Sequence, residues 1–432
     1  MHDLAGLENR YRDALLALIF VGVASCSSDE RAAEGLKDNP ELEEASVIEL
    51  HAAALVLDAH ADIVIPSTSA SYLSDDGSSK VSLDKMRAGG VDAVVMSIAV
   101  GPGPRTEEGD AAARAEADEK LEAINSLVSL SNGNAVLVRS SAELVAAHEA
   151  GKLAIILGFQ NARSLERDIN TIDEFYQAGV RIFGLNHLGH NEFSDSSRPN
   201  FDGTTGKFEV TEEHGGLSEL GASAIKRINA LGALIDVSQM SKSATLQALE
   251  LTTSPVVASH SNAKKVSDVS RNLSDEEIDL IGENGGVIHV AAFKGYLLNI
   301  SEPKFIETLK SLRREVGISE EYNYPFELYW EIEDPAEQVN FITAVSELLG
   351  PATTDNMIEH INYIVDRIGV DHVGIGNDFN HGSGIDDYID ATDAMNLTEG
   401  LIRSGFTQES IDKIWSGNFL RVLDAAARNS TK

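Results

Sequence analysis

The sequence has one cysteine in 432 residues, Cys26, and this scarcity excludes two kinds of structure. A single thiol cannot form an internal disulfide, nor can it build a cysteine-based zinc site. The chain also lacks a GxSxG nucleophile elbow, and no GxxxxGK[ST] or GxGxxG motif follows a predicted strand. A serine nucleophile on such an elbow and a nucleotide cofactor are therefore not indicated.

Basic residues are also few. Lys and Arg number 34 against 69 Asp and Glu, which gives a net charge of −35 and a pI near 4.6. So acidic a surface repels phosphates, which argues against nucleic acid as a partner. The charge is typical of a well-solvated exterior, and the 43% of hydrophobic residues is ample for a large core.

The N-terminal region has no apolar run long enough to cross a bilayer, because the run within residues 15–26 covers only about ten residues. It ends in VASC, which resembles a bacterial lipobox. We therefore expect residues 1–26 to be a lipoprotein signal peptide lipidated at Cys26, and residues 27–46 to be a flexible tether. Ser27 favours an outer-membrane anchor facing the periplasm. The alternative is a buried N-terminal helix with an incidental cysteine.

The rest of the chain, residues 47–432, alternates apolar strand patterns with helical patterns. Eight runs read as buried parallel strands: 54–58, 92–99, 153–159, 181–186, 232–238, 255–259, 285–292 and 372–377. Helical patterns fall at 107–129, 140–150, 171–178, 217–230, 241–251, 274–283, 355–368, 386–403 and 407–429. Eight strands with intervening helices predict one α/β domain, a (β/α)8 TIM-type barrel of the metal-dependent hydrolase kind.

Two segments interrupt the alternation. Residues 189–216 are polar and Gly-rich and should form a loop at the active-site end. Residues 293–350 form a long insertion rich in aromatics, and insertions of this size are usually lids or interaction surfaces. We expect most of its aromatics to pack the insertion onto the barrel: Tyr296, Tyr322, Tyr324, Phe326, Tyr329 and Trp330.

Polar residues stand at the end of strand after strand. His60 and Asp62 close the first run, and because residues i and i+2 of a strand point to the same side, both can reach one cation. His260 ends the sixth run and Asp378 the eighth. Strand ends converge on one rim of a barrel, and imidazole with carboxylate suits zinc. The pattern predicts a metal site of one or two ions, while each residue alone could equally be a structural polar group.

The motifs HAD, LNHLGHN, SHSNAKKVSDVSRN, DHVGIGNDF and GNFLRVL occur in that order over about residues 53–430. Together they resemble the membrane (renal-type) dipeptidases, metallopeptidase family M19. The resemblance implies a (β/α)8 barrel with two zinc ions that hydrolyses dipeptides with a free C-terminal carboxylate. It also implies a homodimer.

The resemblance assigns roles to individual residues. His60 and Asp62 would bind the first metal and His260 the second. Asp378 would take the proton from the attacking water, and also lies where it can bind metal. His187 would polarise the scissile carbonyl or stabilise the oxyanion. Arg271 would pair with the substrate carboxylate, and Asn191, from the same motif as His187, is expected to contact substrate.

Two positions depart from the family. A bridging Glu is replaced by Gln160, and a His of the second metal is replaced by Gln239. Neutral amide oxygens are weak zinc ligands beside carboxylate and imidazole, so we expect one Zn²⁺, or two if these amides or a substitute complete the centre. His381 or His190 could be that substitute, although each could equally be a solvated loop histidine.

Of the other histidines, we expect His289 to be a satisfied residue of the barrel interior and His372 to be structural at the far end of the barrel.

The favoured function is a metallo-dipeptidase, a hydrolase acting in proteolysis on a dipeptide or similar small substrate and held at the membrane by a lipid anchor. Two alternatives stay open. Loss of the second metal could have left a non-catalytic peptide-binding envelope lipoprotein. The barrel could also hydrolyse N-acyl amino acids or lactones.

Overall fold

The computed structural model describes residues 40–202, 207–318, 320, 332 and 334–431. The chain divides into two compact units, residues 1–49 and residues 50–432. The described part of the first unit belongs to helix α2 (Pro40–Ala53), which begins inside the segment predicted as a tether. Cys26 and the predicted signal peptide lie outside the described residues.

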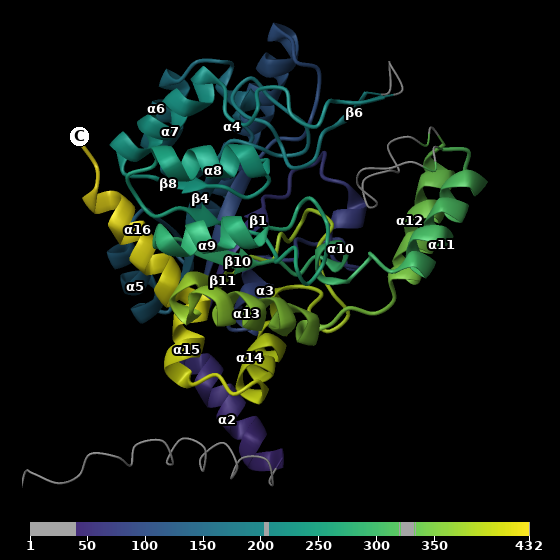
Figure 1. The fold of residues 1–432 in the computed structure, drawn as a ribbon. Helices are drawn as coiled ribbons and strands as arrows, with labels where there is room; N and C mark the ends of the chain where they lie inside the picture. Colours follow the sequence, from purple (N-terminus) through teal and green to yellow (C-terminus); the bar gives the residue numbers. More distant parts are fainter. Residues whose placement is uncertain (1–39, 203–206, 319, 321–331, 333, 432) are drawn as a thin grey trace, which may run out of the picture. The chain divides into compact units, whose positions relative to one another are not determined.

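The second unit contains a parallel barrel ringed by helices (Figure 1). Its strands pair in the order β1 (Leu57–Asp62), β2 (Ala93–Ala99), β4 (Leu153–Gln160), β5 (Val180–Gly184), β8 (Leu234–Asp236), β9 (Val257–Ala258), β10 (Val287–Val290) and β11 (Val373–Ile375). Every one overlaps a predicted strand, so the (β/α)8 prediction is confirmed. The main offset is β1, which runs on through Asp62 instead of ending at residue 58.

The barrel closes between its first and last strands. Ala61 and Phe379 form an isolated parallel bridge, with Asp62 N–H donating to Phe379 O (2.9 Å) and Asp378 N–H donating to His60 O (2.9 Å). The side chain of Asp58 adds to this seam by accepting from the backbone and the side-chain amide of Asn377, each at 2.9 Å. Residues of β1 and of the segment after β11 are thereby held side by side.

A strand that sequence patterning missed, β3 (Ala135–Val138), pairs with β4 outside the barrel order. The register explains its place. β3 pairs with residues 153–156 of β4, whereas β5 pairs with residues 157–160. The short β3 thus covers the part of the β4 edge that β5 does not reach. Two further short strands, β6 (Phe201–Asp202) and β7 (Lys207–Phe208), pair antiparallel in the loop 189–216.

The helices match most of the predicted ranges, but the range 386–403 is α-helical only from residue 394, and the helices at 83–88, 294–297, 303–315 and 335–349 were not predicted. The helices after α2 are α3 (Leu83–Ala88), α4 (Glu107–Leu130), α5 (Ser141–Glu149), α6 (Asn170–Ala178), α7 (Glu219–Leu231), α8 (Lys242–Leu251), α9 (Asp275–Glu283), α10 (Lys294–Leu297), α11 (Pro303–Glu315), α12 (Pro335–Leu349), α13 (Thr354–Ile368), α14 (Ala394–Arg403), α15 (Gln408–Asp412) and α16 (Asn418–Arg428). Ser274 caps α9 in a capping box with Glu277, as the order S-D-E-E predicts. No helix in the described part of the chain combines the length and apolarity needed to cross a bilayer.

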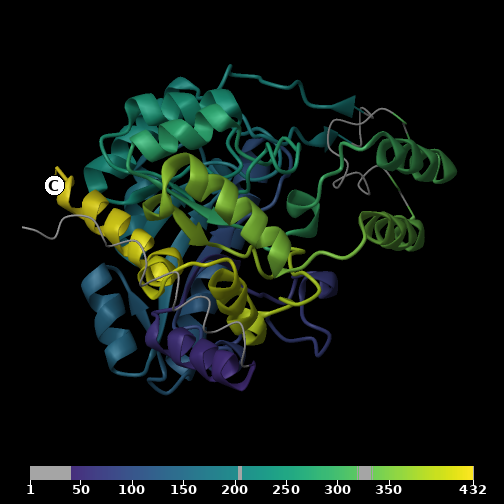
Figure 2. The same ribbon diagram turned by 60° about the horizontal axis from the view of Figure 1, so that its bottom comes forward.

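The insertion forms its own helical layer. Helices α11 and α12 lie side by side, away from the ring of helices, in both ribbon views (Figure 1, Figure 2). Leu309 of α11 packs with Phe341 and Val345 of α12. Tyr296 is buried in a cluster with Val269, and its hydroxyl accepts from Arg198 Nη1, so packing onto residues outside the insertion is confirmed for this aromatic. The other aromatics named in the insertion lie outside the described residues.

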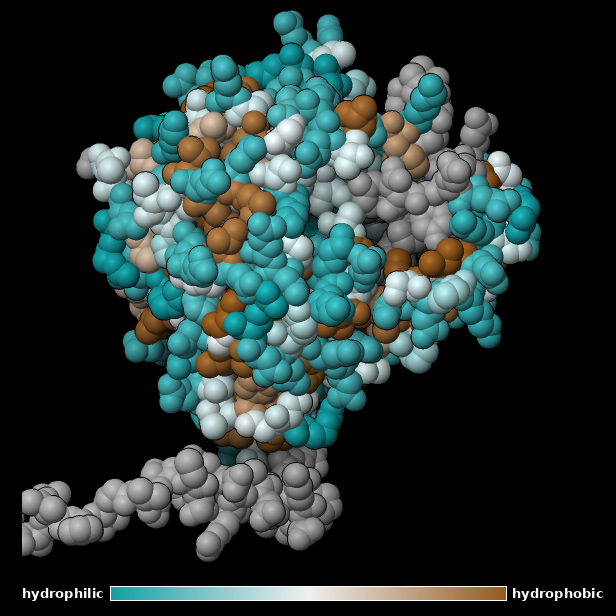
Figure 3. Space-filling view, viewed as in Figure 1, coloured by the Kyte–Doolittle hydropathy of each residue, from teal (hydrophilic) through white to brown (hydrophobic). Residues whose placement is uncertain are grey.

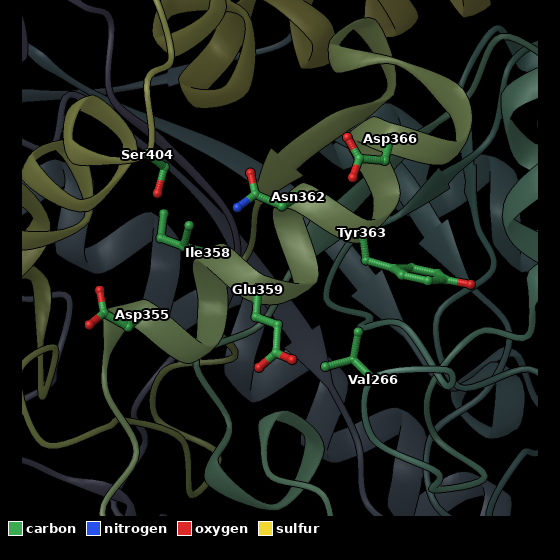
Figure 4. A pocket seen from close by; sticks show the side chains of 8 residues that line it. All are labelled: Val266, Asp355, Ile358, Glu359, Asn362, Tyr363, Asp366 and Ser404. Carbon is green, nitrogen blue, oxygen red and sulfur yellow. The ribbon is translucent and has the colours of Figure 1, made fainter. Parts of the chain in front are cut away.

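The outer surface is polar, and the face seen in Figure 3 is mostly hydrophilic with scattered apolar residues. A groove of about 500 Å³ runs along α13, lined among others by Asp355, Glu359, Tyr363 and Asp366 (Figure 4). None of the residues predicted to do chemistry lines it. The strand ends, and not this groove, hold the candidate site.

Candidate metal centre

His60 and Asp62 lie on β1 and alternate with Ala59 and Ala61, so the two polar side chains share one face of the strand. Both are buried, and His60 Nε2 lies 3.5 Å from Asp62 Oδ1. Neither atom has a hydrogen-bond partner within the described part of the chain. Buried polar atoms are nearly always paired, so two facing orphans indicate a place for a cation.

Asp378 follows β11, and its Oδ1 lies 3.8 Å from His60 Nε2. Its backbone adopts the left-handed region, with φ of 64°, which is uncommon for a residue with a side chain. Burial raises the pKa of this carboxyl, against the opposing charges of His381 and His60. Burial alone would also raise the pKa of Asp62, but contacts with His381 and His60 outweigh it and hold that pKa far below its usual value.

His260 follows β9, and its ring stacks on that of His60 with centroids 3.8 Å apart. Ligand atoms of His60, His260 and Asp378 all lie within 4.8 Å of one another. The predicted convergence of three strand ends is therefore present. Burial and the nearby His60 and Arg271 place the pKa of His260 well below 6.5, so this imidazole is neutral and able to act as an acceptor.

A buried carboxylate and a hydroxyl fix the orientation of His260. Ser259 Oγ donates to Asp236 Oδ2 at 2.5 Å. Because that hydroxyl proton is already used, Ser259 Oγ accepts from His260 Nδ1 at 2.7 Å. Ser259 Oγ also lies 3.4 Å from His60 Nδ1. Both rings thus direct Nδ1 toward Ser259 and Nε2 toward the centre, which is the arrangement that metal-binding histidines usually take.

The two glutamines at the departing positions both contact His260. Gln160 Nε2 lies 3.3 Å and Gln239 Nε2 3.2 Å from His260 Nε2. Gln239, like Asp378, has left-handed backbone, with φ of 67°. Such conformations cost about 1–3 kcal/mol each and persist only where the surroundings impose them. The glutamines therefore take the places predicted for them but present amide nitrogens to the histidine.

His187 and His381 form a pair beside the centre. Their Nε2 atoms are 3.0 Å apart, and His381 Nδ1 lies 3.1 Å from Asp62 Oδ2. Burial, with the nearby His381 and Arg198, holds the pKa of His187 well below 6.5. His381 is thus neither a solvated loop residue nor a contact of the second-metal position, because the residues it bonds are Asp62 and His187.

Arg271 is buried beside the centre. It donates to Ser261 Oγ at 3.0 Å and to His260 O at 2.7 Å, and its guanidinium lies over the Tyr296 ring at 5.3 Å. Its Nε is buried without a hydrogen-bond partner. Burial lowers the pKa of this guanidinium. A buried cation held by neutral groups fits the predicted contact with a substrate carboxylate.

The structure gives Asn191 and His190 other contacts than the sequence analysis considered for them. Asn191 donates to Asn161 Oδ1 and Leu185 O and accepts from the backbone of Phe193 and Ser194. These bonds use its whole amide, so Asn191 braces the loop instead of facing substrate.

His190 likewise bonds Ser196 N and Val210 O with its two ring nitrogens, which removes it as a substitute metal ligand. His289 lies in the barrel interior as predicted and bonds Ala258 O through Nδ1, but it is only half satisfied, because its Nε2 is buried without a hydrogen-bond partner among the described residues. His372 bonds Gly286 O.

The comparison with protein families matches residues 44–432 to the membrane dipeptidases, peptidase family M19. The chain belongs to the membrane dipeptidase family. Dipeptidase verJ of Clonostachys rogersoniana is 25% identical over 318 residues, which cover 73% of this chain and 66% of that protein, just under two thirds of its length.

Solved structures agree with this assignment. The probable dipeptidase PvdM from Pseudomonas aeruginosa superposes with a TM-score of 0.80 at 30% identity, covering 91% of this chain and all of that one. A metallo peptidase from Rhodobacter sphaeroides, liganded with a phosphinate mimic of the dipeptide L-Ala-D-Ala, has a TM-score of 0.65 at 19% identity and covers 86% of this chain and 99% of that one. The latter shows the fold alone.

Membership implies a metal, and the residues present fit one cation. The orphaned His60 Nε2 and Asp62 Oδ1, with Asp378 Oδ1, supply imidazole and carboxylate donors of the kind zinc prefers. They do not fit a second. The free lone pair of His260 faces two amide nitrogens, and the two positions that depart from the family present no carboxylate or imidazole.

Sequence reasoning missed Asp236, Ser259 and Arg198 as parts of the site. Asp236 could have been found, because it is a carboxylate at the end of a predicted strand, like Asp378. Ser259 directly precedes His260 but has no spacing signal of its own. Arg198 comes from the irregular loop 189–216, where no periodicity shows which side chains turn inward.

Proposed function

We propose that the protein is a metal-dependent dipeptidase that hydrolyses the amide bond of dipeptides with a free C-terminal carboxylate. One observation carries the proposal. His60 Nε2 and Asp62 Oδ1 face each other without a hydrogen-bond partner in the described part of the chain, and Asp378 Oδ1 lies 3.8 Å from His60 Nε2. Arg271 is buried at the same rim, where it donates to Ser261 Oγ and His260 O. Membership of the membrane dipeptidase family supports the same reading.

His60, Asp62 and Asp378 would hold one zinc ion. When bound there, zinc would act as a Lewis acid that makes a water molecule acidic enough to attack at neutral pH. Hydrogen bonds that would orient the ligands support this: Ser259 contacts both imidazoles, and His381 contacts Asp62.

Asp378 would accept the proton from the attacking water. Its raised pKa brings its basicity closer to neutral pH, which favours proton transfer. The left-handed backbone at this residue and the bond from its N–H to His60 O fix the carboxylate against β1. The base and the first metal ligands therefore keep a constant spacing.

His187 and Arg271 would bind the substrate. His381 Nδ1 donates to the Asp62 carboxylate, so its Nε2 accepts from His187 Nε2–H. This sets the tautomer in which His187 carries a proton on Nε2, and on substrate binding that N–H would turn from His381 to the scissile carbonyl or its oxyanion. Arg271 would take the terminal carboxylate in a charge-assisted pair.

The test is an assay of purified full-length protein against a dipeptide panel and matched N-acyl amino acids, with and without Zn²⁺, beside elemental analysis of bound metal. We expect zinc-dependent turnover of dipeptides that is lost in Asp378→Asn. Asp371→Asn, which lies at the opposite end of β11, is the control. Turnover of N-acyl amino acids alone would redirect the proposal to that substrate class, and no turnover with metal bound would refute it.

A second candidate, a peptide-binding protein without catalysis, is favoured by the glutamines at positions 160 and 239. It predicts dipeptide binding that depends on Arg271 and no turnover at any zinc concentration. Calorimetry with a dipeptide, run on the same samples, separates the two functions.

For the cell, we propose a lipid anchor at Cys26 in the bacterial envelope and a homodimer. The VASC sequence supports the anchor, and the family supports the dimer. Metabolic labelling with a fatty acid in wild type and Cys26→Ala tests the anchor, and light scattering of the purified protein tests the dimer.

A further inference from the structure

Arg198 reaches the metal centre from the loop 189–216 between β5 and α7. Its side chain is buried, with 7% of the residue exposed. Nη2 donates to Gln239 Oε1 at 2.9 Å, and Nη1 donates to the Tyr296 hydroxyl at 2.8 Å. The guanidinium thus lies one amide group away from His260.

The contact with Arg198 determines which end of the Gln239 amide faces the centre. A guanidinium only donates hydrogen bonds, so the atom it meets must be the amide oxygen. The amide nitrogen is then the atom that lies 3.2 Å from His260 Nε2.

The His260 ring is ready to accept that hydrogen bond. Its Nδ1 carries the proton donated to Ser259, which leaves a lone pair on Nε2. The order of donors and acceptors is consistent from Arg198 through Gln239, His260 and Ser259 to Asp236.

This chain of bonds closes the position where the family implies a second metal. The lone pair that a cation would need is met by two amide N–H groups, from Gln160 and Gln239. The Gln239 oxygen, another possible ligand atom, is held by the Arg198 guanidinium. A guanidinium remains charged at any working pH, so it would also repel a second dication nearby.

Resting on the proposed function above, we infer that Arg198 replaces the second metal. The centre holds one metal ion, and the fixed positive charge of the second position comes from the Arg198 guanidinium, acting through Gln239. The glutamines at positions 160 and 239 and the arginine at 198 form one co-adapted set, in which the arginine compensates the lost dication and the neutral amides avoid an excess of negative charge. Arg198 is therefore a positioning residue of a mononuclear centre.

The experiment measures the number of zinc ions bound per chain in the absence of substrate, so the result does not depend on catalytic activity. Metal-free full-length protein is titrated with Zn²⁺ by calorimetry and analysed for bound zinc after desalting. Three forms are compared: wild type, Gln160→Glu/Gln239→His, and that double variant with Arg198→Met added. Arg198→Lys in the double variant keeps the charge, and Arg421→Met, an arginine that bonds Gly285 O and Asp371 O, is the control.

We expect one zinc in wild type and in the Arg421 control. The triple variant should bind two, with a second-site affinity about a hundredfold or more above that of the double variant, because a like charge within a few ångströms is removed. The Lys form should behave as the double variant.

Two zinc ions in wild type, or equal second-site affinity in the double and triple variants, would overturn the inference and leave the dipeptidase proposal standing. No zinc in wild type would instead contradict the proposed function. Circular dichroism shows whether the triple variant folds. If it does not, the zinc count of wild type and the comparison of the double variant with its Lys form still test the inference. That comparison must show no gain of a second zinc site in the Lys form.

Discussion

His187 and His381 face each other with Nε2 atoms 3.0 Å apart and rings nearly perpendicular, at 88°. The contact joins the residue expected to bind the substrate carbonyl to the carboxylate of Asp62, because His381 Nδ1 bonds Asp62 Oδ2. His381 therefore contacts both the proposed metal ligand Asp62 and the proposed substrate donor His187.

Replacing His381 tests this role. We expect His381→Ala to lower kcat about 10- to 100-fold, the range measured when groups that orient metal ligands are removed. The dipeptide KM should change little, because Arg271 remains. His381→Gln, which can still donate to Asp62, should recover part of the loss. Steady-state kinetics with zinc counted in each sample checks this. A change in KM with kcat unchanged would contradict this role.

Ser259→Ala should weaken zinc binding. The hydroxyl links Asp236 to His260 and touches His60, so its loss frees both rings to rotate. We expect zinc affinity to fall about 10- to 100-fold. Ser267→Ala is the matched control, since Ser267 is equally buried but bonds Leu298 O. Competition with a chelating dye measures both, and equal affinities in the two variants would rule out the role of Ser259.

Gly376→Ala should disturb the rim itself. A Cβ at Gly376 would lie 1.8 Å from Ser259 O, so the ends of β9 and β11 must separate. We expect a loss of about 2–4 kcal/mol in the free energy of unfolding. Gly101→Ala, at a position with open space around its Cβ, should stay within about 0.5 kcal/mol. Urea unfolding of the two variants provides the comparison, and similar midpoints would show that the strand ends adjust freely.

Stability should fall in acid because His360 is buried as the neutral imidazole. Its Nδ1 accepts from Ala263 N–H, and its Nε2 donates to Leu297 O. Burial lowers its pKa to about 4, from a usual 6.5. Between these values the unfolded chain binds more protons, so the stabilising contribution is complete above pH 6.5 and is lost as pH falls toward 4.

For this one group, the loss between pH 7 and pH 5 is about 2 kcal/mol. His360→Gln should reduce the pH dependence of the unfolding free energy by that amount, while other buried histidines such as His289, whose pKa is also about 4, maintain the rest. Asn362→Gln on the same helix is the control. Urea midpoints at both pH values give the measurement, and an unchanged pH dependence in the His360 variant would exclude this assignment.

The barrel could be predicted because most of its strands lie in short runs rich in Val, Ile, Leu and Ala between helical patterns, and burial on both faces favours that composition. The same reasoning placed His60, Asp62, His260 and Asp378 on one rim. The strand β3 escaped, because it is short, half-buried and packed on the edge of β4 alone.

The site residues that could not be predicted from the sequence lie in irregular loops. Asn191 and Arg198 belong to one irregular segment, and composition cannot tell which of its polar side chains turns to the centre and which braces the backbone. Asn191 braces the backbone although its motif predicts a contact with substrate, and Arg198 turns toward the centre although no motif marks it. His381 likewise takes its role from a fold of the chain after β11 that no periodic pattern records.

The position of the proposed metal at the seam between β1 and β11 links metal binding to closure of the barrel. The proposed ligands His60 and Asp62 lie on one side of the seam and Asp378 on the other, while an isolated bridge between Ala61 and Phe379 joins the backbone there. A cation bound by residues from both sides of the seam would hold the first and last strands of the barrel together. Loading would then slow hydrogen exchange at the amides of Asp62 and Asp378 more than elsewhere, so that the protein's resistance to opening and its capacity for chemistry would rise and fall together.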